Sequence, residues 1–181
     1  MRLFAAVDIP QEVVDRLDRL ISRWRPLADL RWSRAGNLHI TTKFIGEWPQ
    51  ERLEEMIACL HRIPLSGPIP IAVRGLGWFP HERSPRIFWA GVEASPSLKD
   101  LAAATERACE DLGIATEKRP FSPHLTLARI DPESRLEKLR EAIAALDTRD
   151  FGNFTADRFF LYESKLRPGG SVYTKLAEFA A

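Results

Sequence analysis

The chain has 181 residues and a formal net charge of only +1, which argues against a protein that grips long nucleic-acid duplexes through many phosphates. Its hydrophobic content of 45% and charged content of 28% are ordinary for a globular domain with one sizeable core. No apolar run approaches the roughly 20 residues that a membrane-spanning helix needs. We therefore expect a cytoplasmic, monomeric protein without a membrane or obligate protein partner.

The first half of the chain predicts a strand, a helix, a strand, a helix and two further strands. The apolar run Leu3–Asp8 predicts the first strand, and it is too short for a signal peptide. Apolar residues at helical spacing predict a helix from about Pro10 to Trp24, and another helix begins near Pro49. Two strand-like runs follow, at Ile69–Leu76 and Arg86–Val92.

The second half predicts a similar series of elements. A helix runs from about Pro96 to Leu112, with Gly113 suited to its end. Another helix begins near Pro132, in a hexapeptide resembling the one that begins at Pro49. The last two strand-like runs cover Phe154–Glu163 and Ser171–Phe179.

The pattern His-x-Thr-x occurs once in each half, at His39–Thr42 and at His124–Leu127, 85 residues apart (positions 39 and 124). Side chains at i and i+2 of a strand point to the same face, so each histidine shares a face with its threonine. Each half thus reads helix, His-x-Thr strand, helix, strand, strand. This order predicts an internal duplication, over approximately residues 10–92 and 96–179, within a single bilobal domain of residues 1–181.

A duplicated unit places equivalent residues around a pseudo-twofold axis, where the two His-x-Thr strands meet. The predicted fold class is α+β, with two pseudo-symmetric lobes, antiparallel sheets lining a central cleft, and helices on the outside.

Two facing His–Thr pairs suit the hydrolysis of a phosphate ester. One neutral histidine takes a proton from water, while the other, protonated, gives a proton to the leaving oxygen. The hydroxyls of Thr41 and Thr126 can donate hydrogen bonds to the non-bridging phosphate oxygens. His39 and His124 are therefore the candidate catalytic residues, although near-symmetry does not decide which is the acid.

Patterns typical of metal sites are absent from the sequence, which lacks Cys-x-x-Cys, His-Glu-x-x-His and an acidic cluster. We expect neither a metal nor another cofactor. Cys59 and Cys109 lie among apolar residues of predicted helices, which indicates buried free thiols. His61 and His81 lie outside both motifs and are not assigned to the site.

Cationic residues precede both motifs and predict a small basic cleft for a short anionic substrate, although each residue alone also fits a solvated loop. They are Arg31 and Arg34 before His39, and Lys118 and Arg119 before His124.

Strict alternation along the two strands makes a further prediction. It places Lys43 on the face of His39 and Phe44 on the opposite face, toward the core. It places Arg129 opposite to His124 unless the strand end turns this side chain toward the phosphate. Arg129 is therefore a supporting candidate for phosphate binding.

The chain resembles the two-histidine (2H) phosphoesterases, and within them the bacterial and archaeal RNA 2′,3′-cyclic phosphodiesterases, also called 2′-5′ RNA ligases. Two signatures carry the resemblance, and shorter matches extend it over nearly the whole chain. These segments are Arg31-Trp32 with Asn37–Glu47, Ser122–Arg129, Phe79-Pro80, Pro85-Arg86, Trp89, Leu161–Ser164 and Tyr173. Thr42 departs from the family pattern, which more often has an apolar residue there.

The resemblance implies a two-lobed α+β fold and metal-independent hydrolysis of RNA 2′,3′-cyclic phosphate ends to 2′-phosphate ends. It implies that His39 donates the proton to the leaving 3′ oxygen and that His124 accepts the proton from water.

Two other functions stay open from the sequence. By microscopic reversibility, an RNA 5′-hydroxyl in place of water would make the protein a 2′-5′ RNA ligase. A binding module that recognises RNA ends without turnover is the other alternative, but it would not need two proton-transfer groups. The substrate is expected to be an RNA end or a small cyclic nucleotide. ADP-ribose cyclic phosphate, 2′-5′ oligonucleotides and uridine-tailed RNA also remain possible.

Overall fold

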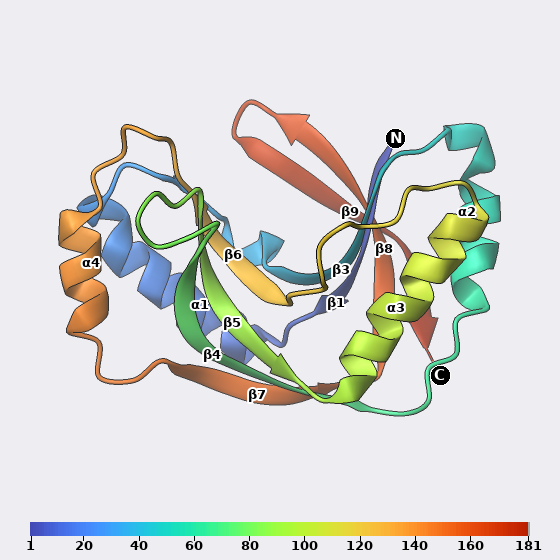
Figure 1. Ribbon diagram of the computed structural model, residues 1–181, viewed down its shortest axis with the longest axis horizontal. Coiled ribbons are helices and arrows are strands. Elements are labelled where there is room, and N and C mark those ends of the chain that lie inside the picture. Colours follow the sequence, from blue (N-terminus) through green and yellow to red (C-terminus); the bar gives the residue numbers. More distant parts are fainter. Residues whose placement is uncertain (181) are drawn as a thin grey trace.

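The structure is a computed structural model that describes residues 1–180, apart from the side chain of Ala94. Figure 1 labels its helices and strands. In chain order they are β1 (Arg2–Asp8), α1 (Gln11–Trp24), β2 (Arg31–Trp32), β3 (His39–Glu47), α2 (Leu53–His61), β4 (Ile69–Phe79), β5 (Ile87–Ala94), α3 (Pro96–Asp111), β6 (His124–Arg129), α4 (Glu137–Ala144), β7 (Asp150–Ala156), β8 (Arg158–Arg167) and β9 (Gly170–Ala180).

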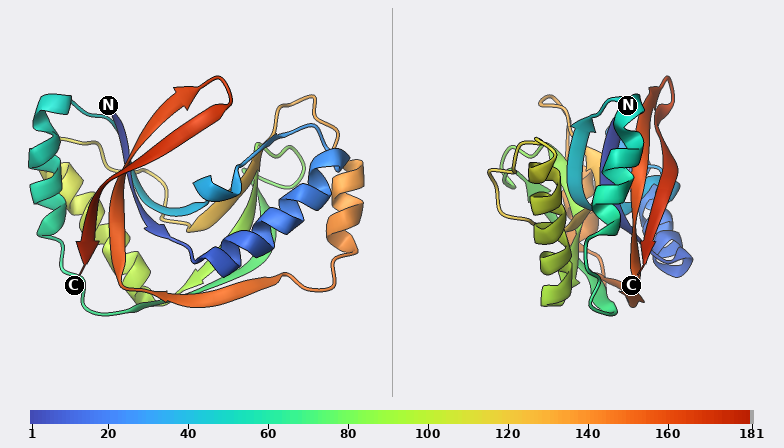
Figure 2. Two further views of the ribbon diagram at one scale, coloured as in Figure 1. Left: turned by 180° about the vertical axis from the view of Figure 1, so that it is seen from behind. Right: turned by 90° about the vertical axis from the view of Figure 1, so that its right-hand side faces the viewer.

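Two antiparallel sheets form the two lobes. One sheet has the order β3-β1-β8-β9 and the other has the order β2-β6-β5-β4-β7. Helices α2 and α3 lie outside the first sheet, while α1 and α4 lie outside the second (Figures 1 and 2). The predicted α+β class, with antiparallel sheets and outer helices, is confirmed. Within the described residues, no helix combines the length and the apolar character that a membrane crossing requires.

The two His-x-Thr strands occupy equivalent places in the chain order. β3 pairs with β1, and the chain between these two strands contains α1. In the same way β6 pairs with β5, and the chain between them contains α3. Each connecting helix packs on the other lobe, because α1 contacts β7 and α3 contacts β3. The lobes are thereby interlocked. β3 also contacts β6, which brings the motif strands together in the middle of the molecule (Figure 1).

Two predicted elements were wrong in detail. The run Phe154–Glu163 is not one strand, because the chain leaves the second sheet after Ala156 and enters the first at Arg158. The fourth helix begins at Glu137 instead of Pro132, after a turn. The short strand β2, which pairs with the end of β6, was not predicted.

One continuous apolar core extends through both lobes. The predicted helix α1 is confirmed, and of the apolar residues at helical spacing, those at positions 13, 17, 20 and 21 are buried while Val14 is half-buried. In the first sheet, the side chains of Leu3, Ala5 and Val7 on β1 pack into this core. Its opposite face carries a separate aromatic cluster, formed by Phe4, Phe160 and Tyr162 with Tyr173 packed against them.

The predicted state of the two cysteines is confirmed. Cys59 and Cys109 are both free and buried. Burial raises the pKa of the Cys109 thiol to about 11, which leaves it protonated and unreactive at neutral pH.

Candidate active site

Both motif histidines stand at the first residue of their strands and are oriented alike. His39 Nδ1 lies 3.1 Å from the carbonyl oxygen of Asn37, and His124 Nδ1 lies 2.8 Å from that of Ser122. A carbonyl oxygen can only accept, so Nδ1 carries the hydrogen in both rings. In each histidine, Nε2 is therefore the nitrogen that exchanges a proton.

Each motif strand contains a β-bulge at the same position. In β3, Thr41 pairs with Ala6 and Lys43 pairs with Ala5, so that Thr42 has no partner of its own. In β6, Leu127 likewise has no partner of its own, and it lies 85 positions after Thr42. The burial of successive residues is also the same in His39–Phe44 and His124–Arg129. These matching irregularities support the proposal of an internal duplication.

The bulges reverse the alternation that the sequence predicts beyond the threonines. Lys43 was expected on the face of His39, but its side chain is buried and only 1% exposed. Phe44 was expected in the core, but it is 62% exposed and lies on the face of His39. By the same shift, Arg129 pairs with Ile87 and comes to the face of His124. Thr41 and Thr126 are half-buried beside their histidines, as predicted.

His39 belongs to a hydrogen-bonded group that the motif does not reveal. Its Nε2 lies 3.1 Å from the Tyr162 hydroxyl and 3.4 Å from Asp8 Oδ1. Tyr162 donates to the same Asp8 oxygen at 2.5 Å, and Lys175 Nζ donates to the other at 2.9 Å. The signals in the sequence for this group were a carboxylate that ends the apolar strand β1 and the resembling segment Leu161–Ser164, which contains Tyr162.

The carboxyl of Asp8 is ionised throughout the neutral range. Burial alone would raise its pKa, but hydrogen bonds from His39, Tyr162 and Lys175 outweigh burial and lower the pKa to about 2. Burial, together with the hydrogen bond to Asp8, raises the pKa of the Tyr162 phenol. Tyr162 therefore stays protonated and presents its oxygen lone pair to His39 Nε2.

His124 has a different environment. Its ring is perpendicular to the Phe79 ring at a centroid distance of 5.0 Å, and Phe79 packs on Trp89 at 5.2 Å. Trp89 lies so close over Gly77 that a Cβ at that position would collide with the indole. Among residues 1–180, no carboxylate lies within ion-pairing distance of His124, in contrast to His39.

Two tertiary contacts hold the motif strands in place. Ser33 Oγ donates to the Thr126 carbonyl at 2.7 Å and the Ser33 amide donates to the Leu127 carbonyl at 2.8 Å, which ties the segment before His39 to β6. Lys43 Nζ donates to Glu106 Oε1 at 2.9 Å and to the Ala115 carbonyl at 3.1 Å. Lys43 thereby connects β3 to α3 and to the segment that leads to His124.

The cationic residues before the motifs divide into two kinds. Arg31 forms an exposed ion pair with Asp131, and Arg34 donates to the Gly169 carbonyl at the tip of the β8–β9 hairpin. Lys118 and Arg119 are exposed in the segment before β6.

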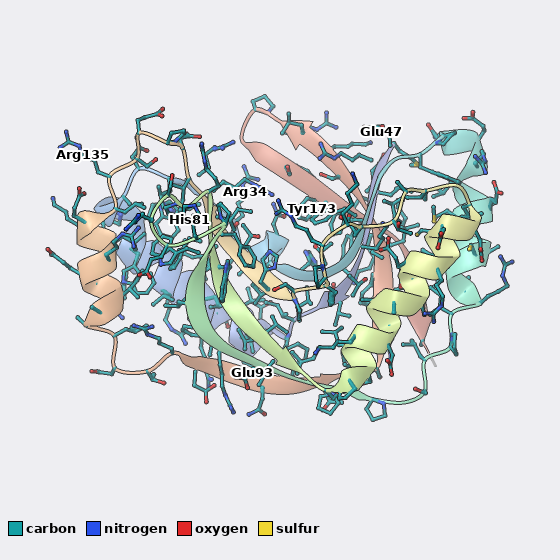
Figure 3. The ribbon with its side chains drawn as sticks, viewed as in Figure 1. Arg34, Glu47, His81, Glu93, Arg135 and Tyr173 are labelled. Atoms are coloured by element: carbon teal, nitrogen blue, oxygen red, sulfur yellow. The ribbon has the colours of Figure 1, made fainter. Side chains whose placement is uncertain are left out.

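The remaining histidines serve other contacts. His61 packs on Phe179, and the ring of His81 accepts a hydrogen bond from the Ser84 amide in the β4–β5 loop. Figure 3 labels His81, together with Arg34 and Tyr173.

A pocket of about 370 Å³ adjoins His39, Asp8 and Tyr162 and extends over the start of α1, where Asp15 and Asp18 line it. A larger pocket of about 550 Å³ lies away from both motifs, near the turn before α4. Within the described part of the chain, no three or more His, Cys, Asp or Glu side chains are grouped to hold a metal ion.

Comparisons with known proteins match nearly the whole chain. The family model described as the 2′-5′ RNA ligase superfamily matches residues 12–167. The RNA 2′,3′-cyclic phosphodiesterase of Methanocaldococcus jannaschii is 32% identical over 180 residues, which cover 99% of this chain and 100% of that protein. The protein of the same description from Thermus thermophilus is 34% identical, and the match covers 99% and 90% of the two chains.

Solved structures agree with this match. The crystal structure of TT0787 of Thermus thermophilus has a TM-score of 0.80 and 33% identity, covering 99% of this chain and 97% of that one. Escherichia coli LigT complexed with 3′-AMP has a TM-score of 0.80 and 27% identity, with the same coverage. The resemblance found in the two sequence signatures is thus confirmed, and the chain belongs to the 2′-5′ RNA ligase superfamily of 2H phosphoesterases.

Proposed function

We propose that this protein hydrolyses RNA 2′,3′-cyclic phosphate ends to 2′-phosphate ends, with His39 as general acid and His124 as general base and without a metal. The observation that carries the proposal is the unequal hydrogen bonding of two otherwise equivalent histidines. Both histidines donate a hydrogen bond from Nδ1–H to a backbone carbonyl oxygen, but only His39 has hydrogen-bond acceptors beside Nε2. The names of the relatives, which are RNA 2′,3′-cyclic phosphodiesterases, support the substrate class.

The surroundings of His39 suit a protonated ring. The Asn37 carbonyl faces Nδ1, while the Tyr162 oxygen and the Asp8 carboxylate face Nε2, and all three accept hydrogen bonds. Tyr162 cannot easily donate to His39, because its proton is engaged by Asp8. An imidazolium satisfies every partner in this group, so His39 is the proton donor to the leaving oxygen.

The surroundings of His124 suit a neutral ring. With Nδ1–H held by Ser122, the lone pair of Nε2 is available to take a proton from water. Thr41 and Thr126 stand on the same faces as the histidines and are the donors to the non-bridging oxygens. Arg129, which the bulge brings to the face of His124, adds a positive charge for the phosphate.

The test is steady-state turnover of a nucleoside 2′,3′-cyclic phosphate by protein dialysed against a strong chelator. We expect an unchanged rate, because the two imidazoles supply both proton transfers. Loss of activity that zinc, manganese or magnesium restores would contradict metal independence. Binding of the cyclic nucleotide without any turnover would favour a module that only recognises RNA ends, and joining to an added RNA 5′-hydroxyl would favour ligation.

Replacing Asp8 by Asn should lower kcat/KM for the cyclic substrate, because the variant keeps the shape of the side chain but replaces the carboxylate that faces His39 Nε2 by a neutral amide. Asp18→Asn removes a charge from the same pocket without contacting His39 and is the matched control. Equal kcat/KM for wild type and Asp8→Asn would mean that Asp8 does not assist the proton donor.

A further inference from the structure

We infer that one face of the β8–β9 hairpin docks the RNA chain that leads to the cyclic phosphate end, an inference that rests on the proposed function. The register of the two strands pairs Ser164 with Tyr173 and, two residues farther out, Leu166 with Ser171. Because side chains alternate along a strand, these four residues point to the same side, and we call them the hairpin face.

The hairpin face begins beside the proposed proton donor. The rings of Tyr173 and His39 lie 5.9 Å apart between centroids. Asn37, two residues before His39, donates from its side-chain amide to the Ser171 carbonyl at 2.9 Å, and Arg34 donates to a carbonyl oxygen at the hairpin tip. These two hydrogen bonds hold the hairpin against the segment that leads to His39. A chain that leaves the site on this side therefore meets the hairpin face.

The outer part of the hairpin face is uncovered. Beyond Ser164, β8 pairs with β9 alone among the described strands, and Figures 1 and 2 show the two strands standing out from the rest of the sheet. Leu166 is 84% exposed, and its neighbours on this face are two serines. An apolar side chain beside hydroxyl groups suits an unpaired nucleotide, which presents an apolar base face together with hydroxyl and phosphate oxygens.

The charge of the hairpin favours a polyanion. The segment Ser164–Tyr173 contains two cations, Lys165 and Arg167, and no carboxylate, in a chain whose net charge is only +1. Arg167 lies at the tip, where Arg34 also reaches. Guanidinium groups bind phosphates well, so these two arginines are placed for the phosphates of the preceding nucleotides. A protein partner would also cover Leu166, but the cations and the RNA-directed names of the relatives favour RNA.

The inference is tested with two substrates that share a terminal cytidine 2′,3′-cyclic phosphate, one a mononucleotide and the other a tetranucleotide. The wild-type protein should favour the tetranucleotide. In Leu166→Ala, the ratio of kcat/KM for the tetranucleotide to that for the mononucleotide should fall roughly 4- to 15-fold, the effect of one or two methylene contacts. Arg167→Ala should lower the same ratio and reduce the salt dependence of tetranucleotide binding by about one phosphate contact.

Two variants are matched controls and should preserve the ratio. Val172 is 41% exposed and pairs with Lys165, which places it on the opposite side of the same hairpin, so Val172→Ala removes an exposed apolar side chain outside the hairpin face. Lys99→Ala removes an exposed cation from α3. An unchanged ratio in Leu166→Ala would overturn the inference and leave this face to a protein partner. An equal loss on both substrates, or an equal loss in Val172→Ala, would also overturn it, because either result indicates a structural role.

Binding separates this inference from the proposed function. If the wild-type protein hydrolyses neither substrate, the proposed function fails, and fluorescence anisotropy of the labelled tetranucleotide tests the hairpin alone. Weaker binding in Leu166→Ala and Arg167→Ala than in Val172→Ala and Lys99→Ala would then support docking on the hairpin face. No binding by the wild-type protein, or equal affinities in all four variants, would overturn it.

Discussion

Replacing His39 or His124 by Ala should each reduce kcat/KM by roughly 100- to 10,000-fold, the usual contribution of a general acid or base. The double variant should be little worse than the more damaging single variant, because the two proton transfers belong to one displacement. Rates measured on a nucleoside 2′,3′-cyclic phosphate give these values. His81→Ala is the matched control, since His81 lies on the exposed β4–β5 loop and should keep normal turnover.

The same variants should fold normally. Both histidines are incompletely buried at the starts of their strands, and Asp8 keeps its hydrogen bonds from Tyr162 and Lys175 when His39 is removed. Thermal unfolding should therefore show a Tm within a few degrees of wild type. Near-normal turnover in either single variant would contradict the two-histidine mechanism. A collapse of Tm would assign the histidine a structural role instead.

Replacing Lys43 by Met should destabilise the fold by about 2–4 kcal/mol, which lowers Tm by on the order of 10 °C. The Lys43 side chain is 1% exposed and its partner Glu106 is 25% exposed, so the substitution leaves a poorly solvated carboxylate without its cation. Denaturant or thermal unfolding measures the loss. Lys99→Met, on the exposed side of α3, should change stability by less than about 0.5 kcal/mol.

A second substitution separates the lost ion pair from lost packing. Glu106→Gln removes the unpaired charge and keeps an oxygen that can accept from the Glu117 amide. Lys43→Met/Glu106→Gln should therefore be more stable than Lys43→Met alone. Additive losses in the double variant would mean that the ion pair contributes little. In that case the role of Lys43 would reside in its hydrogen bond to the Ala115 carbonyl before β6.

The period of the apolar residues was sufficient to predict most elements, including β1, α1 and both motif strands. It did not show where the chain passes from one sheet to the other. Residues on both sides of Asp157 favour strands, so the boundary between β7 and β8 depends on tertiary pairing with β4 and β1. The helix expected at Pro132 began later because a turn precedes it, and local helix signals do not determine that turn.

The candidate site shows the same limit. The histidines and threonines were identified because short spacing along a strand fixes a shared face. Alternation then failed at Thr42 and Leu127, because the residues at a bulge are ordinary strand residues and only the pairing with β1 and β5 reveals the extra one. Tyr162 lies 123 residues from His39. Its role beside Nε2 follows from sheet order, which no local pattern encodes.

Asp8 also relates the site to stability at low pH. Its pKa of about 2 in the folded protein lies below the ordinary value near 3.9, so its ionised form stabilises the fold above about pH 4. That contribution is lost as pH falls through the folded pKa. Asp8 therefore keeps its charge, and the hydrogen bonds that it accepts from Tyr162 and Lys175, throughout the neutral range.

The most direct measurement is phosphorus NMR of the product formed from a 2′,3′-cyclic phosphate substrate in the presence of chelator. With His39 as the acid next to the 3′ oxygen, the P–O3′ bond breaks and the spectrum should show the 2′-phosphate. A spectrum with mainly 3′-phosphate would mean that the substrate binds in the reverse direction or that the two histidines exchange roles. An unaltered cyclic phosphate signal would contradict the proposed hydrolysis itself.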